Sequence, residues 1–175
     1  MEIWDIYDKN RQKTTRTMVR GTPFQKGDYI TVIHGCIFNS KNEMLIQQRQ
    51  STKSGWPNLW DVTVGGSAVE NETSSEAFVR ELYEELGIEV ENKDLRPHIT
   101  INFENGFDDF YLIEQEVNLE DIKLQYEEVQ AVKWATQAEI LEKLDSKEFV
   151  PYHTHFIPFL FSLKNQKNIF ETLKK

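Results

Sequence analysis

The sequence predicts an α/β fold, a single-domain α/β/α sandwich with a mixed sheet. Three observations predict it: strand-like apolar segments recur along the chain, a capped amphipathic helix stands near its middle, and 175 residues suit one compact domain. No repeat, low-complexity stretch or linker interrupts residues 1–175. We therefore expect one domain, in which residues 1–28 form an N-terminal extension with a hairpin.

Two hairpins are expected near the start of the chain. Residues 2–7 alternate between apolar and polar side chains and meet a polar turn at 8–11, which favours a short edge hairpin. Residues 30–38 and 44–48 are mainly apolar and flank the polar turn 39–42. They are therefore predicted to pair as neighbouring strands.

The middle of the chain predicts a strand followed by a helix. Residues 61–64 are typical of a short strand, which would end at a glycine pair. A helix is predicted over residues 74–86, because Thr73 and Glu76 have the spacing of a capping box. Gly87 would end it, since glycine readily adopts the left-handed conformation of a C-terminal cap.

The remaining elements follow from similar signals. Residues 99–103 and 107–113 flank the pair Asn105-Gly106, which favours a tight hairpin. Residues 129–134 are typical of a further strand. Two more helices are expected after it, one opening at residues 136–139 and one within residues 154–175.

The composition excludes several classes of protein. With 20 basic and 29 acidic residues the formal net charge is −9, which argues against binding a nucleic-acid polymer. No apolar run reaches the roughly 18 residues of a membrane span, and the N-terminus lacks a secretory signal, so we expect a cytoplasmic protein with no membrane partner. Cys36 is the only cysteine, which rules out an internal disulfide and a thiolate metal cluster.

The predicted central helix carries a cluster of acids. Glu81, Glu84 and Glu85 stand at i, i+3 and i+4, so their carboxylates lie within one turn, and Arg80 alone cannot balance them. Two interpretations are open: a solvated acidic face, or a site for hard cations such as Mg²⁺, which prefer oxygen ligands. The apolar side chains gather on the other side of the helix, predicted to pack on the sheet: Phe78, Val79, Leu82, Tyr83 and Leu86.

The residues around this helix match a known pattern. Gly66, Glu72 and the run 80–88 resemble the Nudix box at every defined position, without a gap between residues 66 and 88. The chain is thus identified as a member of the Nudix hydrolase family. The resemblance implies a Nudix-type α/β/α sandwich and a pyrophosphohydrolase that uses Mg²⁺ or Mn²⁺ to cleave a small-molecule diphosphate.

The resemblance also implies roles for single residues of the box. Arg80 and Glu72 would form an ion pair that holds the loop against the helix, a supporting role. Glu81 is also a candidate general base, although another acid could serve. The catalytic metal ligands would be the Gly66 carbonyl and the carboxylates of Glu81, Glu84 and Glu85.

Further candidates lie outside the box. Glu128 precedes a strand where family members often place an acid near the metals, so it is a candidate ligand or base, with a surface acid as the alternative. Arg49 ends a strand near the expected cleft and is a candidate phosphate contact. Asp108 and Asp109 either approach the metals or are solvated. Five aromatic residues would either stack on a substrate base or pack in the core: Trp56, Trp60, Phe103, Phe107 and Phe110.

The predicted reaction is metal-assisted hydrolysis, in which water attacks one phosphorus of a nucleoside diphosphate-type or related substrate. Residues 55–60 and Trp134 resemble the subgroup related to isopentenyl-diphosphate isomerase, which is the main alternative. Gly65 and Ser67 stand where that isomerase needs a cysteine and a histidine, which disfavours it. A second alternative is a catalytically silent binding module. The apolar strands and tail are compatible with a homodimer.

Overall fold

The computed structural model describes residues 2–90 and 95–164 of the chain. The chain folds into two compact units. The first comprises Met1–Gly35 and Val64–Tyr111, and the second comprises Cys36–Thr63 and Leu112–Lys175. Strands β3 (Ile30–Phe38) and β8 (Gly106–Glu114) begin in the first unit and end in the second.

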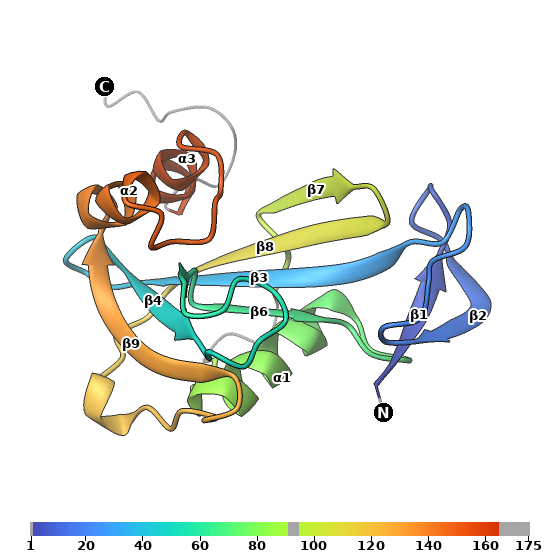
Figure 1. Ribbon diagram of the computed structural model, residues 1–175, viewed down its shortest axis with the longest axis horizontal. Coiled ribbons are helices and arrows are strands. Elements are labelled where there is room, and N and C mark those ends of the chain that lie inside the picture. Colours follow the sequence, from blue (N-terminus) through green and yellow to red (C-terminus); the bar gives the residue numbers. More distant parts are fainter. Residues whose placement is uncertain (1, 91–94, 165–175) are drawn as a thin grey trace. The chain divides into compact units, whose positions relative to one another are not determined.

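The N-terminal extension forms the predicted hairpin as a sheet of its own. β1 (Ile3–Tyr7) and β2 (Lys13–Val19) pair antiparallel in a two-stranded sheet of the first unit (Figure 1). The prediction of an edge hairpin is therefore corrected: the two strands form a separate sheet and do not lie at the edge of the larger one. Its support is a small core of buried apolar side chains, formed by Trp4, Ile6 and Ile30.

β3 and β8 are parallel neighbours, which makes the larger sheet mixed. At their starts the Ile30 N–H donates to the Asn105 carbonyl (2.9 Å), and at their ends the Gln115 N–H donates to the Phe38 carbonyl (3.0 Å). The other strand pairs of this sheet are antiparallel. The predicted α/β class with a mixed sheet is confirmed.

β7 (Ile99–Phe103) and β8 form the predicted hairpin, with one correction. Phe103 pairs with Gly106, so the turn consists of Glu104 and Asn105 rather than Asn105 and Gly106. The glycine is needed for a different reason, because a Cβ on Gly106 would lie 2.4 Å from the Ile30 carbonyl oxygen. It permits a close approach of two backbones rather than a special turn conformation.

The central helix is confirmed at both ends. α1 (Ser74–Leu86) begins at a capping box formed by Thr73 and Glu76 and ends at Gly87, whose φ of 67° is left-handed. It packs beside β6 (Val64–Ser67), the strand that pairs with β3 (Figure 1). The loop between β6 and α1 therefore brings the glycine pair of β6 next to the helix.

In the second unit, β4 (Glu43–Arg49) is the central strand. β9 (Val129–Thr136) pairs antiparallel along its length, and β5 (Trp60–Asp61) pairs with Gln47 and Gln48. The hairpin turn at 39–42, between β3 and β4, is confirmed by the pairing of the two strands at its base. β9 begins at the predicted residue and extends two residues further than predicted.

The predicted single strand 61–64 is wrong, because β5 ends at Asp61 and β6 begins at Val64. Thr63, between the two strands, is fully buried. Its hydroxyl accepts from the Ile37 N–H (2.9 Å) and donates to the Leu45 carbonyl (2.5 Å). These side-chain bonds take the place of regular strand pairing at this point.

Two further helices belong to the second unit. α2 (Gln137–Asp145) opens at the predicted residue with a second capping box, formed by Thr136 and Glu139. α3 (Phe156–Leu163) is the described part of the predicted C-terminal helix; the remainder of 154–175, from residue 165, lies outside the described residues. Among the described residues, no helix is long and apolar enough to cross a membrane.

Candidate active site

α1 presents its acids differently from the prediction. Glu85, expected on the polar side, is only 5% exposed, whereas Tyr83, expected on the packed side, is 58% exposed. At about 100° per residue, Phe78 and Glu85 point in nearly the same direction, so the buried face is centred on these two residues. Glu81 lies at its margin and is largely buried, while Glu84 is half exposed. A solvated acidic face therefore does not describe Glu81 and Glu85.

Glu81 packs against the glycine of β6. A Cβ on Gly66 would lie 2.3 Å from both Cδ and Oε1 of Glu81, closer than real contacts allow. The absence of a side chain at Gly66 therefore makes room for this carboxylate. A Cβ on the adjacent Gly65 would instead meet the ring of His34, with its Nδ1 at 3.2 Å.

Arg80 and Glu72 form the predicted ion pair between the helix and the preceding loop. Arg80 Nε lies 2.8 Å from Glu72 Oε1, and Arg80 Nη2 lies 2.9 Å from Glu72 Oε2. Nη2 also donates to the Ser67 carbonyl at 3.1 Å. This two-bond geometry matches the fork of a guanidinium to a carboxylate, and it raises the pKa of Arg80 above its usual range.

The same guanidinium reaches the helix acids. Arg80 Nη1 lies 2.9 Å from Glu81 Oε1 and 3.0 Å from Glu84 Oε2. Burial raises the pKa of Glu81, although the positive charge of Arg80 beside it acts in the opposite direction. The arginine therefore compensates the acidic cluster only in part.

The donor set of the box consists of oxygen atoms, which suit a hard divalent ion. Among residues 2–90 and 95–164, no three His, Cys, Asp or Glu side chains are grouped as ligands of a single metal. The Oε1 of Glu81 and the Oε2 of Glu84 lie instead beside the Arg80 guanidinium. The chemistry nevertheless fits: carboxylate oxygens with an excess of negative charge lie beside an open backbone at Gly66.

Comparisons with known proteins identify this loop and helix. The sequence model described as NUDIX domain matches residues 28–158. An uncharacterized Nudix hydrolase of Listeria monocytogenes is 44% identical over 169 residues, covering 97% of this chain and 99% of the relative. The chain belongs to the Nudix hydrolase family. A second uncharacterized Nudix hydrolase, from Listeria innocua, is 43% identical over the same shares of both chains.

Solved structures agree on the Nudix fold. DR0079 from Deinococcus radiodurans has a TM-score of 0.74 and 23% identity, covering 91% of this chain and 99% of that chain. The MutT protein of Methanosarcina mazei has a TM-score of 0.60 and is also 23% identical. The match covers 79% of this chain and 96% of that chain. At this identity the two structures establish the fold alone.

Membership makes the protein an enzyme, a Nudix hydrolase. Such hydrolases act on nucleoside diphosphate-linked small molecules and generally use divalent metals. Isopentenyl-diphosphate isomerase of Salmonella is 36% identical over only 61 residues, or 35% of this chain. Gly65 and Ser67 stand at the two positions where the resemblance would require the cysteine and the histidine of that isomerase.

Two candidates outside the Nudix box lie in the second unit, each beside a group of opposite charge. Glu128, immediately before β9, pairs with Lys53. Arg49, at the end of β4, donates from Nη1 to Asp61 (3.1 Å) and from Nε to the Gly55 carbonyl (3.0 Å). The sequence does not predict these contacts, which hold both side chains in defined positions within the second unit.

The candidate aromatic residues separate by burial. Phe107 and Phe110 belong to the core, whereas Phe103 and Trp56 are exposed. Trp60 is half-buried, and the ammonium groups of two lysines from β9 and α2 lie within 5.5 Å of its ring centroid. Of the two predicted roles, stacking on a substrate base or packing in the core, Phe107 and Phe110 have the second.

Asp108 and Asp109 each have partners within the first unit, so neither is freely solvated. Asp108 lies 3.4 Å from His34 Nε2 on β3. Asp109 is fully buried, where it pairs with Arg11 of the N-terminal hairpin and accepts from the hydroxyl of Ser74 at the start of α1. The sequence offered no local signal for these contacts, because their members are far apart along the chain.

Proposed function

We propose that this protein hydrolyses a diphosphate linkage in a nucleoside diphosphate-type or related small molecule, with Mg²⁺ or Mn²⁺ as its cofactor. The observation that supports this most is the burial of Glu81 and Glu85 on the side of α1 that faces β6. Burying carboxylates opposes folding unless positive charge compensates them. The Arg80 guanidinium is shared by Glu72, Glu81 and Glu84, so a divalent cation would add positive charge where one arginine serves three carboxylates.

The residues of the box divide into two groups in this proposal. The metal would be held by the Gly66 carbonyl and by Glu81, Glu84 and Glu85. When bound, it lowers the pKa of a water ligand and offsets the charge that builds on the phosphorus oxygens. Glu72 keeps Arg80 beside the carboxylates, so these two residues orient the ligands and do not react themselves.

The residues outside the box complete the proposal. Either Glu81 or Glu128 would accept the proton of the attacking water; Arg80 lies beside the first and Lys53 beside the second. Arg49 would contact a phosphate and Trp60 the remainder of the substrate. The cytoplasmic location and the homodimer stay predictions.

A product-release screen tests the proposal directly. The panel would comprise nucleoside di- and triphosphates, nucleotide sugars, dinucleotides and coenzyme derivatives, each with Mg²⁺ and with Mn²⁺. Release of phosphate or of a nucleoside monophosphate from at least one class is expected, and excess chelator should abolish it. Turnover that persists in excess chelator would overturn the metal-dependent mechanism.

The same screen separates the alternatives. Adding isopentenyl diphosphate to the panel and following its double bond by proton magnetic resonance tests for isomerisation without hydrolysis. A silent binding module would release nothing from any substrate, yet one of the substrates would raise its melting temperature.

A further inference from the structure

The N-terminal hairpin, β1 and β2, lies wholly before residues 28–158, which match the NUDIX domain, yet it is bonded to the Nudix box. The Ile3 carbonyl of β1 accepts from the Glu70 N–H at 2.8 Å. One residue further on, the Asn71 N–H donates to Asp5 Oδ2 at 2.7 Å. The turn between β6 and α1 is therefore attached to β1 at two consecutive backbone groups.

Asp5 is the centre of this attachment. Its side chain is only 4% exposed, and Lys13 Nζ of β2 lies 2.7 Å from its Oδ2. The same ammonium lies 2.9 Å from Asn71 Oδ1. Asn71 holds a left-handed backbone with φ of 64°, a conformation that asparagine tolerates and that the two side chains stabilise.

The attached turn carries Glu72. Its N–H donates to the Val69 carbonyl (3.1 Å), and its Oε2 accepts from the Val69 N–H (3.0 Å). The carboxylate of Glu72 then holds Arg80, which in turn pairs with Glu81. The turn at Asn71 is thus connected to Glu81, a proposed metal ligand, through the neighbouring Glu72 and then Arg80.

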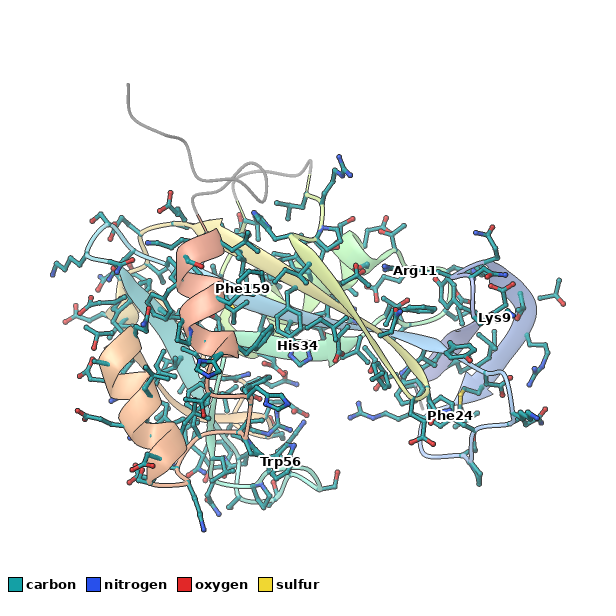
Figure 2. The ribbon with its side chains drawn as sticks, turned by 90° about the horizontal axis from the view of Figure 1, so that it is seen from above. Lys9, Arg11, Phe24, His34, Trp56 and Phe159 are labelled. Carbon is teal, nitrogen blue, oxygen red and sulfur yellow. The ribbon has the colours of Figure 1, made fainter. Side chains whose placement is uncertain are left out.

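A second connection runs from the tip of the hairpin through Asp109 of β8 to the start of the helix. Figure 2 shows Arg11 extending from the hairpin toward β7 and β8. Its Nη1 donates to Asp109 Oδ1 at 3.0 Å and to the Thr100 hydroxyl at 3.2 Å. Asp109 also accepts from Ser74, the first residue of α1. The hairpin is therefore bonded directly to the turn before α1 and is linked to the start of α1 through Asp109.

We propose that the hairpin is a positioning element of the metal site, with Asp5 as its positioning residue. Asp5 holds the turn at Asn71 and thereby fixes the position of Glu72. Glu72 in turn places Arg80 among the carboxylates, and this placement sets the affinity of the site for a divalent ion. This inference rests on the proposed function, because it assumes that the box binds such an ion. A purely structural hairpin would instead support folding alone.

The experiment measures Mn²⁺ binding to the full chain by electron paramagnetic resonance, without substrate. Asp5→Ala should weaken Mn²⁺ binding by about tenfold, the lower end for groups that orient metal ligands. Lys13→Met, a change at an exposed side chain that folding should tolerate, should weaken it in the same direction to a smaller extent.

Asp28 provides a matched control. It is 3% exposed, pairs with Arg16 through both oxygens (2.7 and 3.1 Å), and accepts from the Gln25 N–H (3.1 Å). Asp28→Ala therefore removes the same charge from an equally buried position whose bonds stay within the N-terminal extension. Melting of each variant reports the stability lost, and Asp28→Ala should bind Mn²⁺ like the parent.

The outcomes distinguish the hypotheses. The inference is overturned if Asp5→Ala binds Mn²⁺ as tightly as the parent. If Asp5→Ala does not fold, the same result for Lys13→Met overturns it. It is also overturned if Asp28→Ala weakens binding to the same extent, because the effect would then follow from charge or stability. A parent protein that does not bind Mn²⁺ contradicts the proposed function instead.

Discussion

Arg80 and Glu72 are joined by two hydrogen bonds across the gap between α1 and the preceding turn, at 2.8 and 2.9 Å. The same arginine lies within 3.0 Å of carboxylate oxygens on Glu81 and Glu84. One side chain thus connects the turn, the helix and the proposed ligands. Its loss should affect both the stability of the protein and its activity.

Arg80→Ala is expected to lower the free energy of unfolding by about 2 kcal/mol, since it leaves a largely buried Glu72 without its cation. Activity should fall as well. Urea unfolding and turnover check this, with Arg80→Lys as an intermediate, because lysine keeps the charge and loses the fork. An inactive Arg80→Ala that unfolds like the parent would mean that the arginine contacts substrate instead.

Gly66→Ala should displace Glu81, because the new Cβ would lie 2.3 Å from the carboxylate carbon. We expect a large loss of turnover and of metal binding. Gly65→Ala is the matched control, since its Cβ would be 3.2 Å from a His34 ring that can move slightly. Equal loss in both variants would show that the strand, and not the space for Glu81, is what matters.

Glu85→Gln keeps the size of the side chain and removes one buried charge. Turnover should fall by about two orders of magnitude or more, because an amide is a poor ligand for Mg²⁺ and metal activation supplies several kcal/mol. The metal-free protein should become more stable as like-charge repulsion is relieved. Glu70→Gln, an exposed position in the same box, makes the same charge change and should retain turnover. A Glu85→Gln protein with most of its activity would defeat the mechanism.

Cys36 is fully buried, and burial raises the pKa of its thiol far above the usual range. Because the thiolate is the reactive form, alkylation of the native protein at pH 8 should be slow and should follow the rate of opening. Mass spectrometry after iodoacetamide treatment, with and without denaturant, measures this. Rapid labelling of the native protein would show that the strand around Cys36 opens readily.

Local signals account for much of what was predicted correctly. The capping box of Thr73 and Glu76 and the stop at Gly87 act through backbone groups a few residues away, so spacing alone located α1. The Nudix box is also a local pattern, and its spacing is enough to predict the ion pair of Glu72 and Arg80. A local pattern does not reveal a long-range role. The pair Asn105-Gly106 predicts a turn, whereas Gly106 is needed because the Ile30 backbone approaches it closely.

The sequence by itself therefore determined the fold class, the helix with its ends and the residues of the box. Only the tertiary structure decided which of those residues are buried, since Glu85 faces inward and Tyr83 outward against the expectation from their polarity. It also decided that Asp5 reaches Asn71, which stands 66 positions further along the chain. The physical reason is that capping and turns depend on neighbours in sequence, whereas burial and long-range pairing depend on which surfaces the folded chain brings together.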